Sequence, residues 1–346
     1  MVDLKTSWLG LPLKGPIILG ASPLTHDVDA VADAVAAGAS AVVMYSLFEE
    51  QVVNEQMAAH RFIDARADGD AEASGFLPDL DVFSAGTEPY LKQLARLRDR
   101  LKVPVVASLN GVSPGGWTDY ARACEDRGAD AIELNLYDVV TDPYEAPKHV
   151  EERQLAVVEM VALAVQVPVT VKIGPFYTSV PSFVKRLETS GADGVTLFNR
   201  FYQPDIDLDT ISVDRRLQLS TSQELPLRLN ALAVLSAQTP LALACTGGVH
   251  SGRDAAKALL CGADVLQVTS AVLAHGPKYV GTMVDQLRGW LADTGYASSD
   301  EARGVLAMGS APETHLWGRL NYIKVLDSHH TPAGYYDSPP PPRGAS

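Results

Sequence analysis

Short apolar segments alternate with longer amphipathic ones along most of this chain. The apolar segments are rich in Val, Ile, Leu and Ala, and they occupy residues 16–22, 41–46, 104–111, 131–137, 169–175, 194–199, 241–248 and 265–270. The stretches between them carry apolar residues at helical spacing. A continuous apolar run indicates a strand that is covered on both faces, so the pattern predicts parallel strands with helices around them.

Four of the amphipathic stretches end in a similar way. Residues 118–130, 180–193 and 252–264 each end in Gly-Ala-Asp, and residues 27–39 lead into Gly-Ala-Ser. Glycine just after the last helical turn adopts the left-handed conformation that stops a helix. We therefore expect a helix to end at each of these glycines, directly before the next strand.

Eight such strand–helix alternations predict one α/β domain, a single (β/α)8 TIM barrel, over residues 1–330. An open doubly wound sheet is the alternative, and the lack of G-x-G-x-x-G after the first strand disfavours it. Two long connections, 47–87 and 200–227, follow the second and sixth strands. They lie at the carboxyl ends of strands, where barrel enzymes hold their chemistry, so they are expected to be lids or substrate loops. The Pro-rich tail, 331–346, is expected to be disordered.

Composition and charge argue against several classes of protein. The chain of 346 residues is 47% hydrophobic and 20% charged, and it has no apolar run of about 18 residues and no N-terminal secretory pattern. We therefore expect a cytoplasmic protein without a membrane partner. A net charge of -14 argues against a nucleic-acid surface, although a local positive site could still bind a small anion. Cys124, Cys245 and Cys261 form no C-x-x-C pair, which predicts buried, inert thiols and no metal cluster.

The last two predicted strands both end in small, donor-rich residues. Gly247 and Gly248 follow one strand, and Thr269 and Ser270 follow the next. Glycines let bare backbone amides approach an anion, and the hydroxyls add donors beside them. In a barrel these are the loops after strands seven and eight, so the pattern predicts one phosphate-binding cup.

A structural explanation of the same residues stands beside the phosphate site. The two glycines could serve only to turn the chain into the next helix. Ser251 would then cap that helix, with Asp254 at the third helical position, which is the spacing of a capping box.

Residues 246–306 resemble the C-terminal part of the dihydroorotate dehydrogenase family, and of its soluble class 1 members in particular. The resemblance extends back to about residue 8 through "VTVKIGP", "IELNL" and "PIILGAS". It implies an FMN-dependent oxidoreductase that oxidises dihydroorotate, or a related CH–CH substrate, by hydride transfer to flavin N5, as in pyrimidine biosynthesis. A homodimer is implied as well.

The resemblance also implies roles for individual residues. The two late loops hold the FMN phosphate, and Lys172 contacts the flavin near N1 and O2, where a cation stabilises reduced flavin. Asn135 contacts flavin and substrate, and Asn199 lies on the substrate side. A polar strand end satisfied by its neighbours is the alternative for both asparagines, and a structural salt bridge is the alternative for Lys172. Further matches to flavin-side positions are Ala21, Ser22 and Ser46.

This chain departs from the family where the family recognises its substrate. Asp138 occupies the position of the catalytic base, in "NLYDVV" where the soluble enzymes have N-L-S-C-P-N; it is either a base or a solvated loop carboxylate. Tyr45 replaces the family lysine at the end of the second strand. Residues 72–79 replace the loop whose asparagines hold orotate. These changes disfavour an anionic, orotate-like substrate.

Three functions are therefore compatible with the sequence. The first is the FMN oxidoreductase, with Asp138 and Lys172 as catalytic residues. Its electron acceptor is not identified by any motif, and an electron-transfer protein is one candidate. The second is an FMN-binding barrel with a different substrate or a regulatory role. The third is a phosphate-binding barrel without flavin, in which Lys172 forms a Schiff base.

Overall fold

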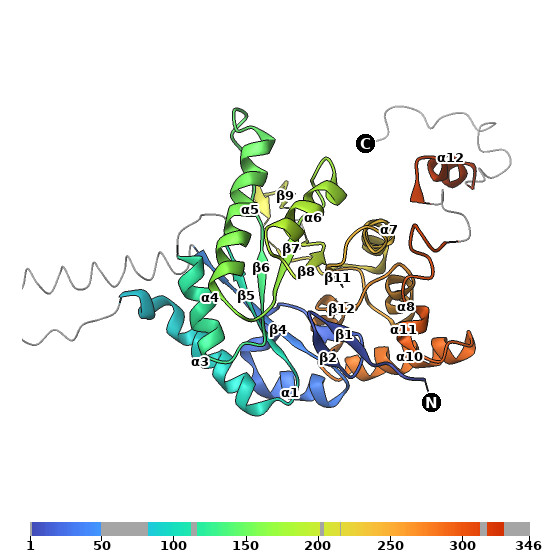
Figure 1. Cartoon of the computed structure of the whole chain (residues 1–346), viewed down its shortest axis with the longest axis horizontal. Helices are drawn as coiled ribbons and strands as arrows, with labels where there is room; N and C mark the ends of the chain where they lie inside the picture. The colour runs from blue at the N-terminus through green and yellow to red at the C-terminus, as the bar shows by residue number, and fades with distance from the viewer. Residues whose placement is uncertain are drawn as a thin grey trace, which may run out of the picture.

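Eight parallel strands close into a barrel, as predicted (Figure 1). The computed structural model describes residues 2–49, 82–111, 116–200, 204–214, 216–311 and 317–328. Neighbouring strands pair in chain order, and the last pairs with the first. The strands are β3 (Ile17–Leu19), β4 (Val42–Phe48), β5 (Val105–Asn110), β6 (Ala131–Asn135), β7 (Val169–Ile173), β8 (Gly194–Leu197), β11 (Ala242–Thr246) and β12 (Val265–Val268).

Helices surround the barrel (Figure 1). The longer ones are α1 (Val28–Ala36), α3 (Val82–Arg100), α4 (Trp117–Asp126), α5 (Pro147–Ala164), α6 (Val180–Thr189), α7 (Leu225–Leu235), α8 (Gly252–Leu260) and α10 (Tyr279–Asp293). Shorter ones are η1 (Pro23–His26), η2 (Ser222–Glu224), α9 (Ser270–His275), α11 (Ser299–Ala302) and α12 (Leu320–Asp327). In the described part of the chain, none of the helices has the length and apolar character needed to span a membrane.

The predicted glycine stops are confirmed. The residues Gly38, Gly128, Gly191 and Gly262 have φ angles of 123°, 88°, 88° and 103°. Each therefore lies in the range that residues with a side chain rarely adopt. These turns lead from α1, α4, α6 and α8 straight into the next strand.

The aspartate after each Gly-Ala pair has a structural purpose that the periodicity did not reveal. Its carboxylate accepts a hydrogen bond from a backbone amide at the start of the preceding barrel strand. The bonds are Val105 N to Asp130 at 2.7 Å, Val169 N to Asp193 at 2.8 Å and Leu243 N to Asp264 at 2.7 Å. One motif therefore ties neighbouring strands together three times around the barrel.

An N-terminal hairpin closes one end of the barrel. Its strands are β1 (Thr6–Trp8) and β2 (Leu11–Leu13), and they pair antiparallel. The hairpin side chains Trp8, Leu9 and Leu13 pack in one cluster with barrel residues that include Ile18 and Val265. The hairpin therefore plugs the amino-terminal end of the barrel and leaves the opposite end for the site.

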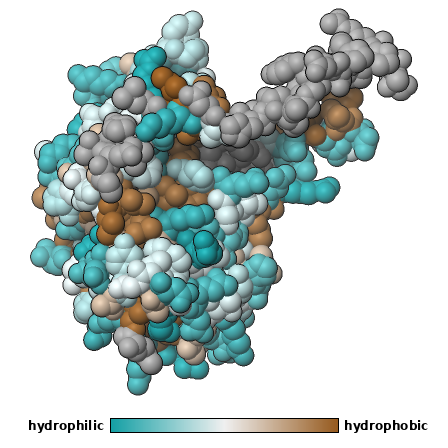
Figure 2. All heavy atoms as spheres, turned by 90° about the vertical axis from the view of Figure 1, so that its right-hand side faces the viewer, coloured by the Kyte–Doolittle hydropathy of each residue, from teal (hydrophilic) through white to brown (hydrophobic). Residues whose placement is uncertain are grey.

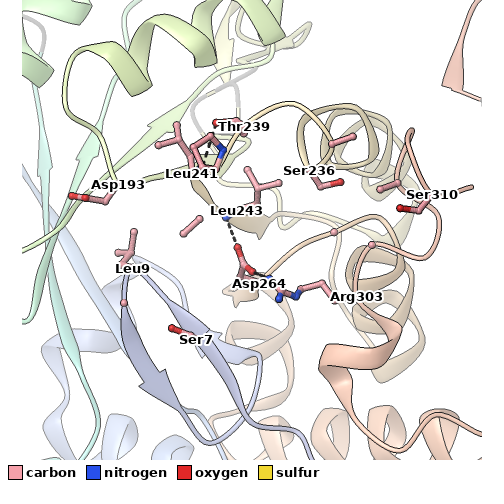
Figure 3. A pocket seen from close by; sticks show the side chains of 17 residues that line it. Ser7, Leu9, Asp193, Ser236, Thr239, Leu241, Leu243, Asp264, Arg303 and Ser310 are labelled. Carbon is pink, nitrogen blue, oxygen red and sulfur yellow. Dashed lines mark hydrogen bonds and ion pairs between the residues drawn. The ribbon is translucent and has the colours of Figure 1, made fainter.

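A hollow of about 660 Å³ lies beside this plug (Figure 3). Asp264 and Arg303 meet there in an ion pair, and Asp264 also binds the Leu243 amide. Burial raises the pKa of Asp264, and the hydrogen bond from the Leu243 amide and the nearby Arg303 oppose that rise. These polar groups tie backbone segments together at the end of the barrel that usually serves stability.

Two of the predicted segments lie wholly or largely outside the described residues. They are the connection after β4, including 72–79, and the tail 331–346. In the connection after β8, an antiparallel ribbon forms from β9 (Asp205–Asp207) and β10 (Ser212–Asp214). Figure 2 faces the side of the molecule that carries α7, α8 and α10, and it shows a mainly hydrophilic surface interrupted by apolar patches.

The three cysteines are buried free thiols, as predicted. Burial raises the pKa of each of them to about 12. A thiol with such a pKa stays protonated and is a poor nucleophile at neutral pH.

Candidate active site

The residues of the predicted phosphate cup lie together at the carboxyl end of the barrel. Gly247, Gly248, Thr269 and Ser270 line one cavity of about 230 Å³. The strands before these residues, β11 and β12, pair directly, which brings the two loops together. The same cavity is lined by Ala21, Ser22, Lys172 and Asn199.

Glycine is required at both positions of the Gly-Gly pair. Gly247 and Gly248 have φ angles of 82° and 80°. A Cβ atom on Gly247 would lie 2.7 Å from the Nη2 atom of Arg228, and one on Gly248 would lie 2.6 Å from the backbone N of Leu225. The loop can therefore approach Arg228 and Leu225 this closely only with bare backbone.

The structural explanation of the next residues is also correct. Ser251 is the N-cap of α8, and its Oγ accepts a hydrogen bond from the Asp254 amide at 3.2 Å. The Asp254 carboxylate in turn accepts from the His250 amide at 3.2 Å. The capping function therefore belongs to Ser251 and Asp254, while the glycines line the cavity.

Ser220 joins the two loops of the cup, and no sequence pattern points to it. Its amide donates to Ser270 Oγ at 3.1 Å, and its Oγ accepts from the Gly248 amide at 3.4 Å. Ser220 Oγ also forms a hydrogen bond with His250 Nε2 at 3.1 Å. The segment that carries Ser220 is irregular, so no periodicity could have indicated that it folds back onto the cup.

Lys172 is buried at the end of β7, with 8% of its surface exposed. Its Nζ atom lies 3.6 Å from Oε1 of Glu133, which is fully buried. The other Glu133 oxygen accepts hydrogen bonds from Gln267 at 2.6 Å and from Thr196 at 3.2 Å. Glu133 is the charge partner that a buried lysine requires, and the pairing of β6 with β7 brings the two together.

Asn135 and Asn199 meet beside this lysine. Asn199 Nδ2 donates to Asn135 Oδ1 at 2.6 Å, and the Asn199 amide donates to the Ile173 carbonyl at 2.7 Å. Asn135 is directly opposite Lys172 in the β6–β7 register. Two side-chain amides and one ammonium group therefore converge at adjacent strand ends, and their contacts with flavin and substrate stay a prediction.

Asp138 lies in a neighbouring hollow and not in the cavity of Lys172. Its carboxylate accepts a hydrogen bond from Arg153 at 2.7 Å, and Arg153 also pairs with Glu145. These two hydrogen bonds raise the pKa of Arg153. The hollow measures about 570 Å³ and lies between the loops after β6 and β7, and Asn199 lines both spaces.

Ser46 and Tyr45 line a third hollow, of about 450 Å³, which shares Ala21 and Ser22 with the cavity. Ser46 Oγ forms a hydrogen bond with Ser108 Oγ at 2.8 Å. The Tyr45 ring stacks on His26, with 3.7 Å between ring centroids. Burial raises the pKa of the Tyr45 phenol, so this wall is neutral where the family has a lysine.

Comparisons with known proteins agree with this geometry. The family described as dihydroorotate dehydrogenase matches residues 3–291. A protein named as dihydroorotate dehydrogenase A (fumarate) from Aeropyrum pernix is 30% identical, over 67% of this chain and 77% of its own length. The NAD-dependent dihydropyrimidine dehydrogenase subunit PreA of Escherichia coli is 26% identical, over 97% of this chain and 86% of its own.

A third relative is the catalytic subunit of dihydroorotate dehydrogenase B (NAD(+)) from Methanothermobacter thermautotrophicus. It is 25% identical, over 87% of this chain and 98% of its own length. These relatives are oxidoreductases by name, and the family match spans most of the barrel. The chain therefore belongs to the dihydroorotate dehydrogenase family.

Proposed function

We propose that this protein is an FMN-dependent oxidoreductase that oxidises a CH–CH bond of a cyclic substrate by hydride transfer to flavin N5. One observation carries the proposal. The donor-rich cup at Gly247, Gly248, Thr269 and Ser270 shares a single cavity with the buried cation of Lys172. A phosphate-binding end and a cationic end in one cavity match the two ends of FMN.

The residues around the cavity fit this cofactor. The Gly-Gly pair has no room for side chains, so its backbone is free to approach a phosphate. Ala21 and the buried Ser22 line the same cavity as the cup and Lys172. When bound, FMN supplies the hydride acceptor.

Lys172 and the two asparagines have distinct tasks in this proposal. The Lys172 ammonium, fixed by Glu133 at 3.6 Å, places positive charge where negative charge develops during hydride transfer. Glu133 is itself fixed by Gln267 and Thr196, so the ammonium does not have to reorganise. The side chains of Asn135 and Asn199 orient the substrate by hydrogen bonds.

Asp138 is proposed to accept the proton that the substrate loses in addition to the hydride, directly or through a water molecule that it binds. Its hollow meets the cavity at Asn199, so a substrate bound by Asn199 can face both spaces. The ion pair with Arg153 keeps the carboxylate oriented. The same ion pair favours the ionised carboxylate, so proton acceptance has to compete with the Arg153 charge.

The two hollows beside the cavity favour a neutral substrate ring. Tyr45 presents an aromatic, uncharged wall in one, and the other is lined by the carboxylates of Asp138, Glu145 and Glu151. Arg153 pairs with two of these carboxylates and Arg186 with the third, so three acids face two cations and a substrate carboxylate would meet net negative charge. We therefore propose a cyclic amide related to dihydroorotate that lacks the carboxylate.

Reduced flavin has to pass its electrons to an acceptor. Two of the relatives are named as subunits, and both names include NAD. We propose that this chain forms a homodimer and passes its electrons to an electron-transfer protein.

An absorption spectrum of the purified protein tests the proposal. We expect a flavin spectrum that bleaches anaerobically with dihydrouracil or dihydrothymine, and more slowly with dihydroorotate. Faster bleaching with dihydroorotate would contradict only the proposal that the substrate is neutral, and the flavin-dependent oxidation would stand. A colourless protein that takes up no FMN would overturn the whole proposal, and borohydride trapping of a substrate on Lys172 would then identify Schiff-base chemistry.

A further inference from the structure

Arg228 is a buried cation directly behind the phosphate cup. It lies in the second turn of α7 and is 4% exposed. Its Nε atom donates to the Thr246 carbonyl at 3.0 Å, and its Nη1 atom donates to the Glu224 carbonyl at 2.8 Å. Both acceptors are neutral backbone groups, so these bonds hold the guanidinium in place without balancing its charge.

The charge of Arg228 is not balanced by a carboxylate within 4 Å in the part of the chain that the structure describes. The carboxylate of Glu224 is engaged elsewhere, because Oε1 accepts from the Thr221 amide at 3.2 Å and from Arg200 at 3.4 Å, and it opposes the effect of burial on Arg228 only in part. A buried charge without a counter-ion is costly. Burial accordingly lowers the pKa of Arg228 from its ordinary value.

The unbalanced charge points at the glycine loop. Nη2 is the guanidinium nitrogen that would lie 2.7 Å from a Cβ atom on Gly247. The place that a side chain would fill is therefore taken by the edge of the guanidinium. Gly247 and Gly248 line the cavity, and the Arg228 cation lies directly behind Gly247 without lining it, in a molecule whose net charge is -14. Arg200 does line the cavity, but it is paired with Glu224 at 3.4 Å.

We infer that Arg228 supplies the positive charge of the phosphate site and thereby selects FMN over the unphosphorylated flavin, riboflavin. This inference rests on the proposed function. The phosphate dianion is the missing counter-ion of Arg228, and the loop amides supply the hydrogen bonds that orient it. Riboflavin has the same ring and no phosphate, so Arg228 contributes nothing to its binding.

The test compares the affinity of the stripped protein for FMN and for riboflavin, measured by quenching of flavin fluorescence. In the R228Q variant we expect FMN to bind roughly tenfold to a hundredfold more weakly. Riboflavin should bind within about twofold of its wild-type affinity, because the change removes charge and not ring contacts. R186Q on α6, which removes the same charge on the outside of the barrel, should change neither affinity.

The outcomes separate the inference from the proposed function. If wild-type protein binds neither flavin, the proposed function fails and this inference fails with it. If wild-type protein binds FMN and R228Q weakens both flavins equally, or neither, Arg228 is only a structural residue of the loop and the inference is wrong. Should R228Q not fold, R228M decides: it also removes the charge, and we again expect a loss of affinity for FMN and not for riboflavin. An unchanged preference for FMN in R228M would then overturn the inference.

Discussion

At the scale of single residues, the site depends on charges that the barrel buries. The charge of Lys172 is balanced by Glu133, and the charge of Asp138 is balanced by Arg153. The charge of the buried Arg228 is balanced by no carboxylate among the described residues. A buried pair adds little net stability, yet loss of one partner leaves the other uncompensated. Substitutions at these positions should therefore affect function and folding together, and each test needs a separate measurement of folding.

Replacing Lys172 with methionine should slow flavin reduction on the order of a hundredfold, because charge stabilisation in the transition state is lost. Anaerobic stopped-flow bleaching measures that rate, and circular dichroism checks folding. K185M, which removes an exposed lysine from α6, is the matched control. A K172M protein that is folded and bleaches at the wild-type rate would refute the role of Lys172.

Replacing Asp138 with asparagine should slow turnover by about a hundredfold or more, because a proton acceptor is lost while the side-chain shape is kept. The amide oxygen can still accept from Arg153, so the loop should keep its conformation. Turnover is measured with the best substrate of the bleaching series. Unaltered turnover would mean that Asp138 is a structural partner of Arg153 and not a base.

His250 should lower the free energy of unfolding at mildly acidic pH. Burial lowers the pKa of His250 from 6.5, and nearby His275 lowers it further, while Asp254 and Glu224 oppose the shift. The unfolded chain therefore binds a proton near pH 6.5, where the folded protein does not, so stability falls as pH drops below about 7. Urea denaturation between pH 7.5 and 5 should show a smaller fall for H250Q; equal falls would contradict this assignment.

At the scale of elements, the Gly-Ala-Asp motif both stops a helix and ties two strands together. Asp193 is the simplest example, because among the described residues it is in no ion pair, unlike Asp130 and Asp264. Its role is to satisfy the Val169 amide at the start of β7. The motif was visible in the sequence, although only its glycine could be interpreted there.

Replacing Asp193 with alanine should lower the free energy of unfolding by about 1 kcal/mol or more, because the Val169 amide loses its acceptor. Asp193→Asn keeps an acceptor oxygen and should cost less. Urea denaturation of the two variants provides the comparison. If both lose equal stability, negative charge matters at this position and the hydrogen bond does not.

At the scale of the whole molecule, the barrel has one plugged end and one open end. The β1–β2 hairpin fills the amino-terminal end, and the loops after β6, β7, β11 and β12 surround the site at the other. Ser220 and Arg228 connect the cup to the segment after β10 and to α7. Ligand binding at the open end should therefore stabilise the whole barrel and not one loop.

FMN at a hundredfold excess over its dissociation constant should raise the free energy of unfolding by about 2.7 kcal/mol, provided that it binds only the folded protein. Removal of the flavin should lower the melting temperature correspondingly. Thermal unfolding followed by circular dichroism, with and without FMN, measures the shift. An identical melting curve in saturating FMN would show that the cup does not bind it.

The order of strands and helices and the helix stops were determined by the sequence alone, and so was the place of two donor-rich turns at strand ends. These features depend on residues close together in the chain: apolar runs, Gly-Ala-Asp, Gly247–Gly248 and Thr269–Ser270. Phosphate binding by the two turns stays a prediction. Local periodicity and backbone preference act over a few residues, so they can be recognised without the fold.

Only the tertiary structure decided which charges meet. Glu133 reaches Lys172 from the neighbouring strand, Arg153 reaches Asp138 across a loop, and Arg228 lies behind a glycine that is 19 residues away. Each contact depends on how elements pack and on the direction of a side chain at a strand or helix end, and the bond from Gln267 to Glu133 also depends on barrel closure. Sequence spacing contains neither of these, and for that reason the counter-ions of the site could not be predicted from the sequence.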